Sequence, residues 1–266
     1  MSKTTSLTQS LLRIVRYLYR VPLLLVHLVL GLPLTLAIMS LPVLANRRVS
    51  PNNVHLDSWI LCWWQRQFVR IFGLQVRTVG RPIAGPVLFV ANHVSWVDIS
   101  VMHSQANMGF VAKQEIANWP LIGRLALKGK TIFHRRGNAQ SLDNVVVAMI
   151  ERLQHGAPIG VFPEGHSRGG GKLGIFHARI FQAAVETSSP VQPVALQYGS
   201  GGCAQSLVAF RPKETFMHNL VRLLGEPSRQ TSVYFLEPID VREVTGRRQV
   251  AHLARERIFE AMQSKD

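Results

Sequence analysis

The chain has 266 residues, enough for one large α/β domain with a sizeable core or for a smaller domain plus an anchor. It carries 30 Lys and Arg against 15 Asp and Glu, and the net charge of +15 predicts an anionic partner. A nucleic-acid binder with this charge is normally more polar, whereas 47% of these residues are hydrophobic. We therefore expect membrane lipid, and not nucleic acid, as the partner. The two cysteines, Cys62 and Cys203, form neither a metal-binding spacing nor a disulfide framework, which indicates a reducing compartment.

The N-terminal segment is apolar and flanked by basic residues. Residues 1–20 interleave Arg and Lys with Leu, Ile, Val and Tyr, which predicts a basic amphipathic helix. From Val21 to Ala45 the chain has no Lys, Arg, Asp or Glu, and about 20 apolar residues can span a bilayer. The Gly31-Leu32-Pro33 string predicts a break into two arms, the second too short to cross. A hairpin that dips into one leaflet and a kinked single span both fit this pattern.

Residues Ser58 to Phe72 form a second candidate for the membrane interface. Tryptophan and phenylalanine alternate there with Arg66 and Arg70, which lie on one face of a helix. An ordinary packing helix with a polar face explains the pattern equally well.

From Pro86 onward the pattern predicts an α/β domain. Short, almost continuous apolar strands alternate with helical spacing, as in Leu142, Val146, Met149 and Leu153, which predicts a mostly parallel sheet covered by helices. We expect anchoring helices over 1–48, an interfacial helix and connector over 49–85, and the α/β domain over 86–266. The expected strands are Val87–Ala91, Met108–Ala112, Thr131–His134, Ile159–Phe162, Val191–Gln197 and Ser232–Leu236.

Asn92 and His93 follow the first of these strands, at the end where ligands bind in open α/β sheets. Histidine suits a general base near neutral pH, and a carboxylate on its other ring nitrogen would fix the tautomer. Residues five apart on one helix do not face each other, so His93 must lie in a loop, with Asp98 in the first turn of the next helix. Ser95 is then the expected N-cap. The plainer alternative is a loop histidine beside a helix-start carboxylate.

Basic residues and one carboxylate follow the other strands. Lys113 ends the second strand, Arg135 and Arg136 follow the third, and Glu164, Gly165 and Arg168 follow the fourth. Parallel strands bring these ends to one edge, and the arginine fork matches phosphate oxygens. Lys113, Arg136 and Arg168 thus predict a phosphate pocket, although any single arginine in so basic a chain fits a solvated surface charge. Glu164 fits a hydrogen bond to a substrate hydroxyl or to an arginine, or a turn carboxylate.

Together these strings resemble the lysophosphatidic acid acyltransferase family of glycerolipid acyltransferases. The first family motif matches Asn92-His93 through Asp98, and the third matches Phe162-Pro163-Glu164-Gly165. The second resembles Gly129 to Arg136, and the fourth resembles Gln192-Pro193-Val194. The resemblance implies that His93 is the catalytic base with Asp98 as its partner. It also implies that Arg136, Glu164, Gly165 and Arg168 bind the phosphoglycerol part of the acceptor.

The implied reaction moves a fatty acyl group from acyl-CoA or acyl carrier protein to the hydroxyl of a lysophospholipid, most simply 1-acylglycerol-3-phosphate, giving phosphatidic acid. No metal, other cofactor or acyl-enzyme is implied. The implied location is the inner (cytoplasmic) membrane, with the catalytic domain facing the cytoplasm. Arg135 and the inserted His166-Ser167 depart from the family pattern on the acceptor side, so lyso-ornithine lipid or another lysolipid is an alternative acceptor. A thioesterase or other hydrolase and a non-catalytic basic membrane-binding protein are alternatives of another class.

Overall fold

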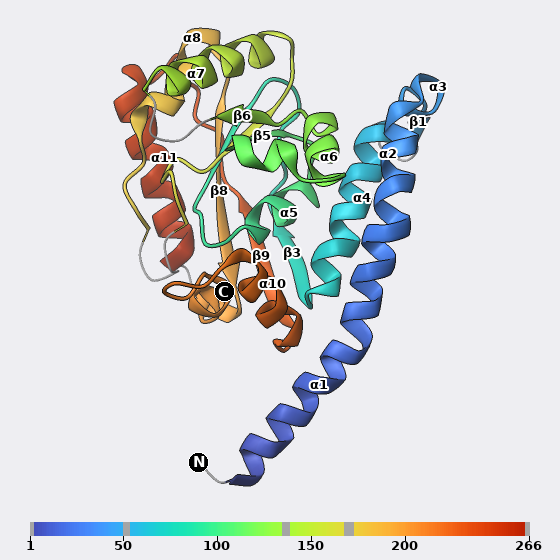
Figure 1. The fold of residues 1–266 in the computed structure, drawn as a ribbon. Helices are drawn as coiled ribbons and strands as arrows, with labels where there is room; N and C mark the ends of the chain where they lie inside the picture. The colour runs from blue at the N-terminus through green and yellow to red at the C-terminus, as the bar shows by residue number, and fades with distance from the viewer. Residues whose placement is uncertain (1–2, 50–53, 135–138, 168–172, 264–266) are drawn as a thin grey trace.

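A single sheet forms the centre of the α/β part of the molecule (Figure 1). The computed structural model describes residues 3–49, 54–134, 139–167 and 173–263. Within these residues the sheet has seven strands in the order β3-β9-β8-β4-β7-β5-β6, and all neighbours are parallel except β8 and β9. The strands are β3 (Leu74–Val79), β4 (Leu88–Ala91), β5 (Gly109–Lys113), β6 (Ile132–His134), β7 (Ile159–Val161), β8 (Val191–Tyr198) and β9 (Arg229–Phe235).

Both faces of the sheet are covered, as the near-continuous apolar strands predict. On β4, Phe89 and Ala91 belong to one buried cluster and Leu88 and Val90 to a second on the opposite face. The first cluster includes side chains of α4 (Leu56–Ile71), α5 (Val97–His103), α9 (Gln205–Val208) and α10 (Phe216–Gly225). The second includes side chains of α7 (Ala139–Gln154), α8 (Gln182–Thr187) and α11 (Gly246–Gln263).

The expected α/β architecture is confirmed, with one strand missed and one orientation not foreseen. All six expected strands are present with ends shifted by at most three residues. β3 was not predicted because it is an edge strand whose outer positions are exposed, so no apolar run marks it. β9 runs antiparallel to β8. The remaining short elements are β1 (Arg48–Val49), β2 (Val54–His55), α6 (Ile122–Lys128) and the 3₁₀ turns Gln114–Asn118, Ala178–Phe181 and Ser200–Gly202.

The N-terminal segment is one long helix without the expected break at Gly31. α1 (Lys3–Val26) continues through a π-helical turn (His27–Gly31) into α2 (Leu32–Ser40). Pro33 cannot donate a backbone hydrogen bond, and the wider turn just before it accommodates that loss without ending the helix. The chain turns instead at Leu41, which has an extended ψ of 107° before Pro42, as the residue before a proline favours. α3 (Pro42–Ala45) follows, and α4 then lies beside α2 (Figure 1).

The exposed face of this long helix is apolar, and its arginines turn toward the protein. The segment Thr8–Ser40 is long and apolar enough to cross a membrane, and its most apolar window is only 17% buried. Arg20 is 2% exposed and donates to the backbone oxygens of Leu224 and Glu226 at 3.0 and 2.7 Å. Arg16 donates to the Gly225 oxygen at 3.1 Å. The unpaired carbonyls at the C-terminal end of α10 carry partial negative charge, which explains why arginines dock there.

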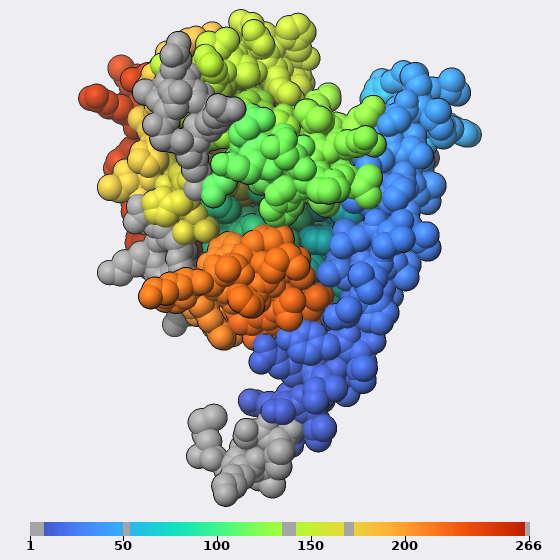
Figure 2. All heavy atoms as spheres, in the orientation of Figure 1, coloured from blue at the N-terminus to red at the C-terminus, as the bar shows by residue number. Residues whose placement is uncertain are grey.

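α4 is partly a packing helix and partly an exposed aromatic surface. Trp64 is buried and stacks on the His27 ring with 4.5 Å between ring centroids. Trp59 and Trp63 are each about 40% exposed and stack on each other at 6.5 Å. Figure 2 shows the N-terminal helix along one side of the molecule, and Figure 1 shows α1 extending past the α/β domain. α4 thus has a buried packing face and an exposed aromatic face, and the membrane contact of the exposed face stays a prediction.

Candidate active site

His93 and Asp98 meet at the carboxyl end of β4. His93 lies in the loop after this strand, α5 begins at Val97, and Asp98 lies in its first turn. The His93 Nδ1 is 2.8 Å from Asp98 Oδ2, with side chains 15% and 0% exposed. The folding back that the five-residue spacing requires is therefore present. With Nδ1 engaged by the carboxylate, Nε2 is the ring nitrogen left to accept a proton.

The carboxylate of Asp98, and not the hydroxyl of Ser95, organises the start of α5. Asp98 Oδ2 accepts the backbone N–H groups of Val94 and Ser95 at 2.6 and 2.9 Å. The expected Ser95 hydroxyl cap is wrong: Trp96 holds the N-cap position, and the buried Ser95 Oγ has no partner among the described residues. Only half of a capping box is present. The Asp98 carboxylate accepts backbone N–H groups that precede it, but the Ser95 hydroxyl accepts none from the first turn of α5.

Sequence reasoning missed Tyr198, which also bonds to Asp98. Tyr198 ends β8, is fully buried and donates its hydroxyl to Asp98 Oδ1 at 2.5 Å. Burial first, and the Asp98 carboxylate second, raise the pKa of Tyr198 well above its ordinary value, so the phenol remains a donor. The only sequence signal was a tyrosine directly after the strand expected over Val191–Gln197; that this strand lies beside β4 comes from the structure.

Asn92 ties the catalytic loop to β8. Its side-chain amide donates to the Leu196 oxygen at 3.0 Å, and its side-chain oxygen accepts the Leu196 N–H at 2.7 Å. This pair continues the parallel ladder between β4 and β8 beyond Ala91, where the backbone of β4 leaves the sheet. The loop that carries His93 therefore begins from a fixed point.

Glu164 holds the catalytic loop through its backbone. The carboxylate is 2% exposed; Oε1 accepts the His93 N–H and Oε2 accepts the Gly174 N–H, both at 2.8 Å. Gly165 follows in the left-handed region with φ of 74°, and a side chain there would meet the His177 ring. Glu164 thus links the loop after β7 to the loop after β4, and this support was not foreseen from the sequence.

Aromatic rings complete the wall beside the histidine. The Phe162 ring stacks on the His93 ring with 4.2 Å between centroids and on Phe110 at 5.7 Å. Further along the loop, Trp96 contacts Phe72 and Phe216 edge-on. The Phe162 stacking and the bond to Asp98 restrict the imidazole to few orientations.

A buried polar network supports Trp96 from behind. Its indole N–H donates to Asn219 Oδ1 at 2.8 Å, and the Asn219 amide donates to Glu214 Oε2 at 2.8 Å. Glu214 also pairs with Arg222 at 2.7 Å, and this guanidinium lowers the pKa of Glu214 to about 2. α10 therefore positions the catalytic string on one face and receives the α1 arginines at its C-terminal end.

The predicted phosphate-binding residues are placed only in part. Lys113 is exposed at the end of β5, on the same sheet edge as the His93 loop, because β5, β7 and β4 are parallel. Arg136 and Arg168 lie outside the described residues. Among the described residues, no group of three His, Cys, Asp or Glu side chains is placed to hold a metal ion.

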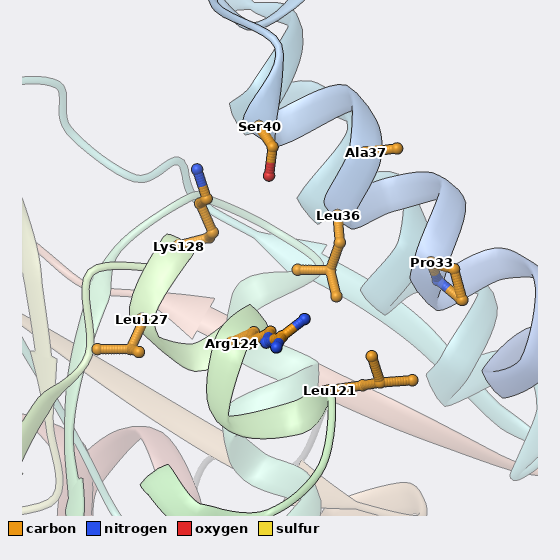
Figure 3. A pocket seen from close by; sticks show the side chains of 8 residues that line it. All are labelled: Pro33, Leu36, Ala37, Ser40, Leu121, Arg124, Leu127 and Lys128. Atoms are coloured by element: carbon orange, nitrogen blue, oxygen red, sulfur yellow. The ribbon is translucent and has the colours of Figure 1, made fainter.

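A separate cavity of about 630 Å³ lies between α2 and α6 (Figure 3). None of its lining residues belongs to the His93 or Glu164 loops. Arg124 and Lys128, one turn apart on α6, lie beside an otherwise mostly apolar lining, and the Lys128 ammonium donates to the Met39 oxygen at 3.4 Å. The lining residues are Pro33, Leu36, Ala37, Ser40, Leu121, Arg124, Leu127 and Lys128.

Comparison with known proteins agrees with this geometry. A family model described as Acyltransferase matches residues 73–197. The chain is 37% identical to a lyso-ornithine lipid O-acyltransferase of Pseudomonas aeruginosa, over 66% of this chain and 68% of that protein. It is 31% identical to the protein of the same name from Brucella abortus, over 76% and 81%. It is 38% identical to a 1-acyl-sn-glycerol-3-phosphate acyltransferase of Neisseria gonorrhoeae, over 45% and 48%.

The fold is also shared with a solved structure. The crystal structure of PlsC, the 1-acyl-sn-glycerophosphate acyltransferase of Thermotoga maritima, superimposes with a TM-score of 0.69 over 96% of both chains, at 20% sequence identity. The family model matches the segment that holds His93, Asp98 and Glu164, and two relatives align over two thirds or more of their own length. This chain therefore belongs to the acyltransferase family.

Proposed function

We propose that the chain is an O-acyltransferase that moves a fatty acyl group from a thioester to the hydroxyl of a lysolipid. The observation that carries the proposal is the His93–Asp98 pair, whose side-chain atoms are 2.8 Å apart. The pair lies at the carboxyl end of β4, where ligands bind in such sheets, within the segment that the family model matches. A pair held in this way supplies a base whose tautomer is fixed and whose protonated form is stabilised.

The proposed chemistry needs only His93 as proton carrier. Nε2 takes the proton of the acceptor hydroxyl as the oxygen attacks the thioester carbonyl. The tetrahedral intermediate then collapses, the C–S bond breaks, and the leaving sulfur takes the proton back from the imidazolium. The products are an ester and a free thiol. Burial raises the pKa of the Cys62 thiol to about 11, which disfavours that cysteine as a competing nucleophile.

The lysolipid acceptor is proposed to bind to residues at the same edge of the sheet as His93. Lys113, Arg136 and Arg168 would bind the anionic headgroup, with Gly165 leaving room for it. Glu164 belongs to this set by resemblance, and its two hydrogen bonds to backbone N–H groups support a role in shaping the pocket. The donor is acyl-CoA or acyl carrier protein, both of which suit a chain with a net charge of +15.

The proposed acceptor is 1-acylglycerol-3-phosphate, which the matched motifs and the Neisseria relative support. The second candidate is lyso-ornithine lipid. It is favoured by the two relatives of that name, which align over two thirds or more of their own length. Both acceptors offer a hydroxyl to the same base, so the proposed reaction is the same for either.

The enzyme is proposed to sit on the inner membrane, with the α/β domain on the cytoplasmic side. The long helix contacts the domain near both ends, at Arg16 and at Met39. These residues are about 35 Å apart along a helix at ~1.5 Å per residue. A bilayer crossed along that axis would enclose much of the α/β domain, so a helix lying within one leaflet fits better. Its exposed apolar face then meets the acyl chains.

An acyl-transfer assay on the detergent-solubilised full chain tests the proposal. Labelled acyl-CoA or acyl carrier protein is offered with lysophosphatidic acid and, in parallel, with lyso-ornithine lipid. We expect esterification of one acceptor, lost in His93→Ala and retained in His252→Ala, a control at an exposed histidine on α11. Undiminished transfer by His93→Ala would refute the assigned base. Release of free fatty acid without any acceptor would indicate a hydrolase instead.

A further inference from the structure

Asp98 is surrounded by more donors than its pairing with His93 needs. Oδ2 accepts the Val94 and Ser95 N–H groups as well as the imidazole. Oδ1 accepts the Tyr198 hydroxyl at 2.5 Å. The side chains of Asp98 and Tyr198 are both fully buried, so water does not replace the hydrogen bond between them.

The position of Tyr198 is fixed by its own surroundings. Its backbone N–H donates to Gln205 Oε1 at 3.0 Å, and the Ala204 N–H donates to its carbonyl at 2.8 Å. Gly199 follows with φ of 77°, where a side chain would come within 2.7 Å of Cys203 Sγ. The strand end is therefore locked in a turn that only glycine takes without strain, and the phenol has one place to point.

We propose that Tyr198 is a positioning residue for acyl transfer: its hydroxyl, bonded to Asp98 Oδ1, turns Oδ2 toward His93 and limits how strongly the carboxylate holds the imidazolium. The inference rests on the proposed function of His93 as the base. Tyr198 is fully buried and acts only through Asp98.

The Tyr198 hydroxyl should change the proton affinity of His93 in one direction only. A donor on Oδ1 spreads the carboxylate charge, so the imidazolium is held less tightly and gives up its proton more readily. Without that donor, the carboxylate charge is less spread, and its attraction for the imidazolium grows. The base then becomes free of its proton only at higher pH. Among the described residues, Glu164 contacts this loop through the His93 N–H, and His177 lies against Gly165.

Tyr198→Phe removes the hydroxyl and keeps the ring. At neutral pH we expect kcat to fall by about tenfold to hundredfold, the range for a hydrogen bond to a charged group. We expect KM for the lysolipid to stay within about twofold, because Tyr198 lies away from substrate. The acid limb of the kcat/KM profile should move to higher pH. Tyr234→Phe, the same change at a buried tyrosine on neighbouring β9, should leave that limb in place.

A readout independent of turnover separates this inference from the proposed function. We expect the His93 imidazole resonance, assigned by its loss in His93→Gln, to titrate at higher pH in Tyr198→Phe than in the wild type. That shift supports the inference even if no lysolipid is acylated. A folded Tyr198→Phe protein with unchanged His93 titration and unchanged acid limb, and only a lower Tm, would overturn it.

A second variant decides the matter if Tyr198→Phe does not fold. Replacing Tyr198 by 3-fluorotyrosine keeps the hydroxyl and makes it a stronger donor, so the His93 titration and the acid limb should move to lower pH. Movement to lower pH relative to the wild type is a result that a purely packing role of the ring does not produce. Absence of any movement with this residue would also overturn the inference.

Discussion

Glu164→Gln tests whether the buried carboxylate shapes the active site or binds the acceptor. The side chain accepts two backbone N–H groups, from His93 and Gly174, each at 2.8 Å. Glutamine has the same shape, but its amide nitrogen cannot accept, so one of the two N–H groups faces another donor. A hydrogen bond to a charged group contributes about 1.5–3 kcal/mol, and an unpaired buried donor costs a comparable amount. We expect the free energy of unfolding to fall by about 2–4 kcal/mol.

Thermal unfolding of the detergent-solubilised protein measures this loss directly. At about 2–4 °C per kcal/mol for a chain of this size class, Tm should fall by roughly 4–16 °C. If Glu164 acts by holding the His93 backbone, kcat should fall while KM for the lysolipid changes little. Glu186→Gln, at an exposed glutamate on α8, is the matched control and should change neither. A normal Tm combined with a raised KM would refute the reasoning and place Glu164 on the acceptor.

Three further outcomes are expected. Arg20→Met removes bonds to one buried and one partly buried backbone oxygen at the α10 terminus, so we expect a loss of about 2–4 kcal/mol and easier tryptic cleavage of α1. The pKa of Glu214 is lowered to about 2 by the Arg222 hydrogen bond, so its stabilisation is complete above about pH 4.5 and is lost as pH falls toward 2. Tm should therefore drop across that window, and less so in Arg222→Met. Arg124→Gln combined with Lys128→Gln should weaken binding to anionic vesicles by about 30-fold, at ~1 kcal/mol per charge near the surface.

These outcomes have matched controls on α11, on the opposite side of the molecule from α2 (Figure 1). Arg248→Met removes an exposed arginine and should not change Tm or the cleavage of α1. Arg247→Gln with Arg248→Gln lowers the net charge by the same two units as the α6 double variant. Equal weakening of vesicle binding by both double variants would mean that net charge alone, and not the α2–α6 surface, meets the lipid.

The contact between His93 and Asp98 could be predicted from the sequence because its geometry is local. Five residues separate His93 from Asp98, and strand, loop and helix start leave one way for them to meet. Glu164 was found as a candidate but its partners were not, since the backbone N–H of Gly174 carries no sequence signal. Tyr198 lies 100 positions from Asp98, so only the pairing of β4 with β8 brings them together.

The same distinction applies to the fold. Buried strands such as β4 and β8 are apolar throughout and were predicted, whereas β3, with alternating exposed polar residues, was not. Pro33 is a strong breaker signal, but its effect is local and a π-helical turn absorbs it. Arg16 and Arg20 were expected on a lipid-facing helix, because composition shows charge and not the direction in which a side chain points.

The contact between Arg20 and α10 has a consequence for the order of biosynthesis. Arg20 and Leu224 are separated by 204 positions, and β3 likewise pairs with β9 near the far end of the chain. At about 5–20 residues per second, α1 leaves the ribosome roughly 10–40 s before the helix on which it docks. During that interval α4 can already pack beside α2, but the part of α1 around Arg16 and Arg20 lacks the helix on which it docks. With the proposed membrane location, attachment of the nascent chain would precede completion of the α/β domain, and the domain would fold at the membrane surface.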